Sequence, residues 1–179
     1  MKKISVRMIT HVAFLIALEI VLNRFVSINT MSVKIGFAFV PVAICGMLYG
    51  PFWAALVASV ADVIGAVFLN PMPSPYFPPI TITAALMGIT FGLLLHHKRN
   101  PSLLHTTIAA AVSNFVLSLC LQSYWLTFLT GNPYSVQFTM RIFQAVVIFC
   151  VQAVMLPILL KMSTSLNRHF SFYEVPVGT

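Results

Sequence analysis

Residues 33–92 decide the fold: VKIGFAFVPVAICGMLYGPFWAALVASVADVIGAVFLNPMPSPYFPPITITAALMGITFG. A Gly-Pro pair and a proline-rich stretch divide them into three apolar segments, and two charged residues interrupt these, Lys34 near the beginning and Asp62 in the middle. Because an ionised group is costly in hydrocarbon, a carboxylate within such a segment is a candidate functional residue. We therefore expect the rest of the chain to supply walls and partners for this region.

The composition is that of an integral membrane protein. Of the 179 residues, 59% are apolar and 7% are charged, and the mean hydropathy is +0.96. A soluble domain carries about 25% charged residues, so a water-soluble fold is excluded. Continuous apolar runs argue against a β-barrel, whose strands alternate in polarity. The net charge of +7 reflects the distribution of cations in membrane proteins rather than a nucleic-acid partner.

The sequence predicts an all-α membrane protein, a single domain over residues 1–179 with six transmembrane helices. We read the N-terminal apolar segment as the first span rather than a signal peptide, because no small-residue cleavage pattern follows it. A tight turn is expected at Gly50-Pro51, and an ordered, kinked loop over the prolines of residues 70–79. The predicted spans cover residues 8–26, 36–48, 52–69, 80–95, 103–129 and 136–162.

The cations predict the orientation of the chain. If the chain has six spans, seven of its ten cationic residues fall on one side of the membrane. They are Lys2, Lys3, Arg7, Lys98, Arg99, Lys161 and Arg168. The positive-inside rule makes that side cytoplasmic, so both termini are expected inside.

The remaining charges and several aromatic residues then gather in the external half. Cations and aromatic rings together suit a planar, anionic small molecule, because rings stack on its flat part and Arg or Lys pairs with its carboxylates. A carboxylate such as Asp62 suits an amino-heterocycle, from which it accepts two hydrogen bonds. The candidate substrate-binding residues are Arg24, Lys34, Asp62, Asn70, Tyr76, Phe77, Tyr124, Trp125 and Arg141.

Two plainer interpretations stay open for these residues. In the first, Asp62 pairs with Arg24 or Arg141 in a structural ion pair between helices. In the second, which concerns other residues, Tyr124 and Trp125 belong to the aromatic belt at the membrane surface.

Other features limit the possible chemistry. Ala13 and Ala17 form a small-residue surface on the inner half of the first span, which suits packing within the chain or docking of another membrane protein. The sequence has no Walker A motif and no HExxH or GxSxG motif, so neither ATP, nor a metal, nor another cofactor is expected to bind. His11 is expected to be solvated, and Glu19 to hydrogen-bond between helices.

Four segments occur in the order found in one known family. They read ALEIVLNRFVSI (17–28), VKIGFAFVPVAICGMLYGP (33–51), SVADVIGAVFLNP (59–71) and PYFPPITITAALMG (75–88). On these motifs the chain resembles the substrate-binding S components of energy-coupling factor (ECF) vitamin transporters, and most closely their folate-type branch. The resemblance covers residues 1–95 well and the remainder loosely.

This resemblance implies a six-helix protein of the bacterial plasma membrane that captures a vitamin from outside. It implies partners: the transmembrane coupling protein EcfT and two cytoplasmic ATPases, whose ATP hydrolysis topples the S component so that it releases the vitamin inside. The chain itself would not be an enzyme. Ala13 and Ala17 match the family's motif for contact with the coupling protein. Arg24 matches the arginine of its LSRF-like motif, and Asp62 the aspartate of its AD-x-x-G motif.

The loop LNPMPSPYFPPITI (69–82) departs from the family pattern, since it is longer and has prolines in place of glycines. Folate is the leading substrate because three outer cations suit a glutamate-tailed ligand; pantothenate or a hydroxymethylpyrimidine/pyridoxine-type vitamin is the alternative.

Two other functional classes compete with a transporter subunit. A lipid-modifying enzyme would use Asp62 and His11, which the predicted topology separates by half a membrane. A non-transport membrane assembly protein would tolerate Asp62→Asn.

Overall fold

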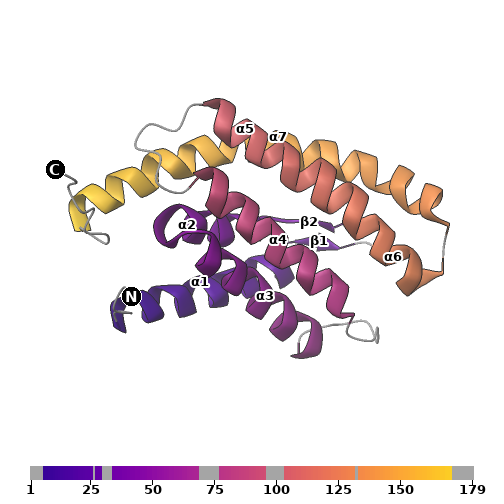
Figure 1. Cartoon of the computed structure of the whole chain (residues 1–179), viewed down its shortest axis with the longest axis horizontal. Coiled ribbons are helices and arrows are strands. Elements are labelled where there is room, and N and C mark those ends of the chain that lie inside the picture. Colours follow the sequence, from indigo (N-terminus) through magenta and orange to yellow (C-terminus); the bar gives the residue numbers. More distant parts are fainter. Residues whose placement is uncertain are drawn as a thin grey trace.

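The structure is a computed structural model that describes residues 6–25, 27–29, 34–68, 77–95, 103–131 and 133–170. Within these ranges it contains six helical segments (Figure 1). They are α1 (Val6–Arg24), α2 (Phe39–Tyr49), α3 (Pro51–Phe68), α4 (Pro78–Leu95), a continuous segment of α5 (Leu103–Ala111), η1 (Val112–Leu121) and α6 (Gln122–Thr130), and α7 (Tyr134–Phe170).

The prediction of an all-helical membrane fold is confirmed. Five helices are long and apolar enough to cross a membrane, and α2 is a shorter apolar helix. Most boundaries lie within a few residues of the predicted ones. The helix α4 begins at Pro78 rather than Ile80, because proline is well suited to the first turn of a helix. The predicted turn at residues 96–101 and most of the proline loop lie outside the described residues.

The second predicted span, residues 36–48, corresponds to a short helix that begins three residues later than predicted. Helix α2 has 11 residues and is about 17 Å long, too short for a hydrocarbon core of about 30 Å. A two-stranded antiparallel hairpin, β1 (Ile28–Asn29) and β2 (Lys34–Ile35), precedes it. Because this segment pairs as extended chain, α2 begins at Phe39 rather than Gly36. It is a core helix, with Ala43 and Cys45 fully buried.

The tight turn predicted at Gly50-Pro51 is present. Gly50 has φ 91° and donates its backbone N–H to the Gly46 carbonyl at 3.2 Å, and α3 begins at Pro51. A positive φ favours glycine, which has no Cβ to clash. Gly131 ends α6 in the same way, with φ 70°.

Glycines let α2, α3 and α4 approach closely. A Cβ at Gly46 would lie 3.0 Å from the Gly92 nitrogen, and one at Gly88 would lie 2.5 Å from the Ala54 carbonyl oxygen. These contacts are with backbone atoms, which cannot turn aside as a flexible side chain can. The three helices therefore form a closely packed block.

Replacing Gly88 with alanine is expected to lower the midpoint of thermal unfolding by several degrees. The added methyl group forces α3 and α4 apart, and overpacking costs about 1–3 kcal/mol, with about 2–4 °C per kcal/mol in a chain of this size. Differential scanning fluorimetry in detergent measures the midpoint. Leu93→Ala, which changes a side chain 66% exposed on the same helix, is the control and should change the midpoint little. An unchanged midpoint for Gly88→Ala would contradict the close approach.

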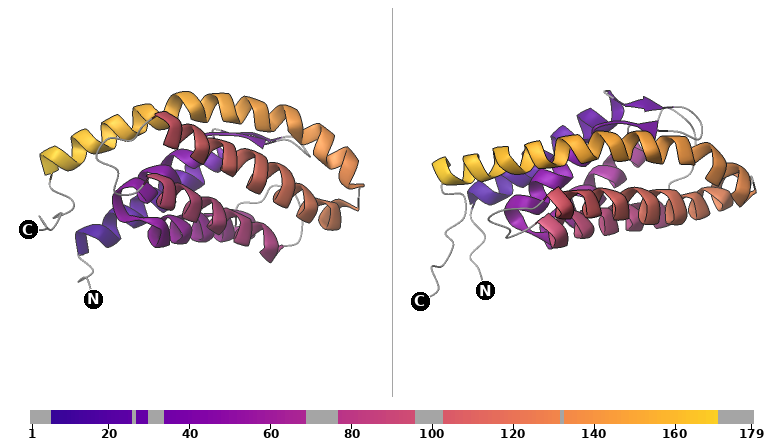
Figure 2. Two further views of the ribbon diagram at one scale, coloured as in Figure 1. Left: turned by 45° about the horizontal axis from the view of Figure 1, so that its top comes forward. Right: turned by 90° about the horizontal axis from the view of Figure 1, so that it is seen from above.

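The two ends of the bundle differ in character. The beginning of α1, the end of α4, the beginning of α5 and the end of α7 lie at one end, on the left of Figure 1, and the connection between α6 and α7 lies at the other (Figures 1 and 2). The apolar core lies toward the first end, and includes Val12, Leu15, Phe91, Leu95, Leu156 and Leu159. The first described helix therefore begins, and the last one ends, at the same end of the bundle, and the orientation in the membrane stays a prediction.

His11 is partly exposed and also has a protein partner, which the sequence did not indicate. Its Nδ1 lies 2.8 Å from the Tyr49 hydroxyl, in hydrogen-bond contact, and the two rings stack with centroids 6.5 Å apart. The two residues meet because α1 and α2 pack together near the end of the bundle where α1 begins. Glu19, farther along α1, is 5% exposed.

Candidate functional site

The buried face of α7 changes from polar to apolar along the helix. In the first part of α7, Gln137, Arg141 and Gln144 are 1%, 5% and 4% exposed, whereas Leu156 and Leu159 face the apolar core farther on. Opposite this helix, the buried polar residues of η1 and α6 are Ser113, Asn114 and Ser123. A polar layer therefore lies between α7 and the η1–α6 segment.

Arg141 is the charged residue of this layer. Its Nη2 donates a hydrogen bond to Gln122 Oε1 at 3.0 Å. Its Nε and Nη1 are buried and have no hydrogen-bond partner in the described part of the chain. Because a guanidinium stays protonated in proteins, this side chain is a buried cation with two donors available to an acceptor.

An amide pair bounds the layer on the side of the apolar core. Asn114 Nδ2 donates to Gln152 Oε1 at 2.7 Å and to the Ala110 carbonyl at 2.8 Å. Asn114 lies in the π-helix η1, a form of helix that is rare and frequent at functional sites. Beyond this pair, Ala109 and Ala110 belong to the apolar core.

Asp62 hydrogen-bonds to Thr81, which is neither of the two arginines considered as its partner in a structural ion pair. Its Oδ2 accepts a hydrogen bond from Thr81 Oγ1 at 2.7 Å, so α3 is joined to the first turn of α4. Within the described ranges α3 makes no contact with α7, so Asp62 does not pair with Arg141. The side chain of Arg24, the other possible partner, lies outside the described part of the structure.

Aromatic rings connect the beginning of α4 with α6. The rings of Phe77 and Trp125 are 6.4 Å apart and tilted by 60°, and Trp125 Nε1 is buried with no hydrogen-bond partner among the described residues. Trp125 lies three residues after Gln122, so the two share a face of α6. Three contact pairs therefore join neighbouring helices: Asp62 with Thr81, Phe77 with Trp125, and Gln122 with Arg141.

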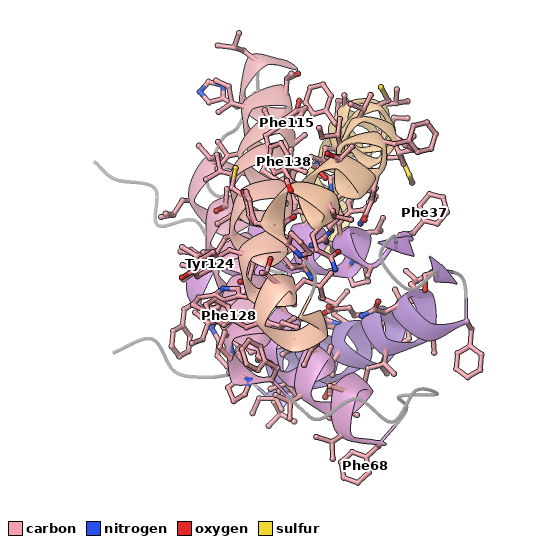
Figure 3. The ribbon with its side chains drawn as sticks, turned by 90° about the vertical axis from the view of Figure 1, so that its right-hand side faces the viewer. Phe37, Phe68, Phe115, Tyr124, Phe128 and Phe138 are labelled. Carbon is pink, nitrogen blue, oxygen red and sulfur yellow. The ribbon has the colours of Figure 1, made fainter. Side chains whose placement is uncertain are left out.

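Tyr124 lies on the outside of this arrangement. It is 48% exposed and packs edge-to-face on Trp125 at 5.3 Å and on Phe128 at 5.1 Å. Tyr124 and Phe128 lie along the surface of the bundle in Figure 3. This position favours the aromatic-belt interpretation for Tyr124, while Trp125 faces inward.

Four of the predicted residues have side chains outside the described part of the structure. Asn70 and Tyr76, and the side chains of Arg24 and Lys34, lie outside what the structure describes. Their backbone positions place Arg24 at the end of α1 and Lys34 in β2, a strand that packs against α7. Their roles stay predictions.

Sequence reasoning missed the amide residues of the polar layer. The spacing i, i+4, i+7 places Gln137, Arg141 and Gln144 on one face of a helix. This pattern could have indicated a polar face on the last span. Gln122 carries no such signal, because its contact with Arg141 joins residues from different spans.

The comparisons with known proteins identify the family. The family described as "ECF transporter, substrate-specific component" matches residues 7–162. The chain belongs to this family. It is therefore a multi-pass protein of the bacterial plasma membrane and the substrate-specific component of a transporter rather than an enzyme, and its family works with an ECF module.

Two curated relatives are named "Folate transporter FolT". The protein of Clostridium novyi (strain NT) is 33% identical over 156 residues, which cover 87% of this chain and 88% of the relative. The protein of Leuconostoc mesenteroides subsp. mesenteroides is 31% identical over 124 residues, which cover 69% of this chain and 65% of the relative.

Two solved structures share the fold. The crystal structure of FolT bound with folic acid matches with a TM-score of 0.81 and 28% identity, over 88% of this chain and 95% of that one. The S component for biotin from an ECF-type ABC transporter matches with a TM-score of 0.67 over 91% of this chain. Its identity of 15% supports the fold alone.

Proposed function

We propose that this S component captures folate from outside the cell for uptake by an ECF transporter. The observation that carries the proposal is the similarity to a folate transporter over 87% of the chain at 33% identity. The likeness to FolT bound with folic acid, at a TM-score of 0.81, supports the same substrate.

The chemistry of the site suits folate. Folate combines a flat amino-pterin, an aromatic ring and a glutamate tail with two carboxylates. The Phe77 and Trp125 rings suit its flat parts, and the Asp62 carboxylate suits the N–H groups of an amino-heterocycle. Arg141 offers two buried donors without a partner among the described residues, which suits an anionic or strongly polar oxygen of the ligand.

Titration of the purified protein with folate tests the proposal. Trp125 is one of two tryptophans, and the other, Trp53, lies at the beginning of α3. Folate is expected to quench the fluorescence of a Trp53→Phe variant, in which Trp125 is the remaining reporter. Calorimetry gives the affinity independently of fluorescence. If pantothenate or a pyridoxine-type vitamin bound and folate did not, that vitamin would replace folate as the substrate. If none of the three bound, the proposal would be overturned.

The proposed partners are the transmembrane coupling protein and two ATPases, whose ATP hydrolysis reorients the S component and releases folate inside. Ala13 and Ala17 are the proposed docking residues. Both are exposed on α1, and the surface around them is apolar, with Phe14 66% exposed. Small exposed residues let another helix approach closely.

Ala13→Trp and Ala17→Trp are expected to retain folate binding and to lose co-purification with the coupling protein and folate uptake. A bulky ring at either position holds the partner helix away from α1. The control is Val154→Trp, which enlarges a side chain 63% exposed on α7. Assembly of the complex by both alanine variants would show that the docking surface lies elsewhere.

A further inference from the structure

Among the residues that the structure describes, no carboxylate pairs with Arg141. The elements that pack against α7 are α2, α5, η1, α6 and β2, and none of them contains Asp or Glu. The chain has three acidic residues. Glu19 and Asp62 lie on α1 and α3, which make no contact with α7 in the described ranges. Glu174 comes after the last residue of α7 in the sequence and lies outside the described residues.

Gln122 holds Arg141 without neutralising it. Its amide oxygen accepts one hydrogen bond from the guanidinium and carries no charge. The side chain has about the size and reach of glutamate, which would form an ion pair at the same position. An amide here orients the guanidinium and leaves its Nε and Nη1 donors available.

The backbone fixes the direction of Gln122. Its N–H donates to the Leu117 carbonyl, five residues earlier, as the π-helix η1 passes into α6. This wider turn sets the rotation at which α6 begins. The same rotation directs Gln122 toward Arg141 and places Trp125, one turn later, on the side of Phe77.

We propose that Gln122 is a positioning residue of the substrate site: it orients the Arg141 guanidinium and leaves its charge to be met by an anionic group of the substrate. This inference rests on the proposed function, because the substrate supplies the missing acceptor. It also assigns the substrate class, since a ligand without an anionic or strongly polar oxygen leaves the cation unmatched.

Gln122→Glu tests the inference, because it is expected to change stability and affinity in opposite directions. The new carboxylate pairs with Arg141, so the unfolding midpoint of the ligand-free protein should rise by about 2–4 °C. The same carboxylate competes with the substrate's anionic group, so the Kd for folate should rise about 10–100-fold. Scanning fluorimetry and calorimetry measure the two effects on the intact chain.

Two further variants separate positioning from a structural role. Gln122→Met removes the acceptor at similar size and should weaken folate binding by about tenfold without raising the midpoint. Gln152→Glu places a carboxylate in the same polar layer, opposite Asn114 rather than Arg141, and should lower the midpoint. If Gln152→Glu raised the midpoint as well, the stabilisation would not depend on Arg141 and the inference would be wrong.

The two proposals fail in different ways. If the wild-type protein binds folate and Gln122→Glu binds it equally well, the inference is wrong and the proposed function stands. A Gln122→Glu variant that loses both stability and affinity also overturns the inference, since the new carboxylate then forms no ion pair. A wild-type protein that does not bind folate overturns the proposed function, and the inference with it.

Discussion

Replacing Arg141 with methionine is expected to weaken folate binding by about 100-fold. A hydrogen bond to a charged group contributes about 1.5–3 kcal/mol, and Arg141 offers two donors that have no partner within the described structure. Calorimetric titration of the purified variant measures the change. Arg141→Lys keeps the charge and loses the planar fork of donors, so its affinity should lie between those of the wild type and the methionine variant.

The stability of the ligand-free Arg141→Met variant provides the control. A buried cation without a counter-ion is costly, and replacing it by an apolar side chain of similar length should preserve or raise the unfolding midpoint. Loss of affinity with a preserved midpoint would then report on the ligand contact rather than on misfolding. An affinity within twofold of the wild type would contradict a role for Arg141 in binding.

Replacing Asp62 with asparagine is expected to weaken folate binding by about 10–100-fold. The amide oxygen of asparagine still accepts the hydrogen bond that Thr81 donates to the carboxylate at 2.7 Å, so the joint between α3 and α4 is retained. The negative charge offered to an amino-heterocycle is lost, and a charged hydrogen bond is worth about 1.5–3 kcal/mol. Competition binding against labelled folate measures the change.

Thr81→Val is the matched control for Asp62. It removes the hydrogen bond between α3 and α4 and leaves the carboxyl group in place, so it should lower the unfolding midpoint more than the affinity. If Asp62→Asn bound folate as the wild type does, Asp62 would have the structural role that a membrane assembly protein predicts.

Most of the helices could be predicted, because the length of an apolar segment and the Gly and Pro residues that end it are local properties of the sequence. The Gly50-Pro51 turn is a sequence of two residues, and its position was predicted correctly. The first residue of α2 could not be predicted, because the pairing of β1 with β2 depends on residues on both sides of the hairpin. The π-helix η1 was not predicted either, because its residues are as apolar as those of an ordinary α-helical span.

The candidate site could be predicted in part. Arg141 and Asp62 are recognisable because charges are rare in apolar spans. Their neighbours are not, because Thr81 and Gln122 each lie 19 residues from the partner they bind. An uncharged polar residue in a span has many possible environments, and only the packing of the helices decides which one it meets.

The polar and apolar regions lie at different levels of the bundle. The apolar core and the close glycine contacts hold α1 to α4 together near the end where α1 begins. The buried polar residues of α6 and α7 lie toward the other end. This division suits a protein that binds a polar vitamin at one level and offers an apolar surface on α1 to a membrane partner.

An experimental structure of the folate-bound protein, in detergent or lipid nanodiscs, tests this interpretation at the level of atoms. We predict folate between the beginning of α4, α6 and the first part of α7, with one of its oxygens within hydrogen-bond distance of Arg141 Nε or Nη1. Gln122 should still accept the hydrogen bond from Arg141 Nη2. Folate bound elsewhere, with the Arg141 guanidinium facing only protein, would contradict the proposed site.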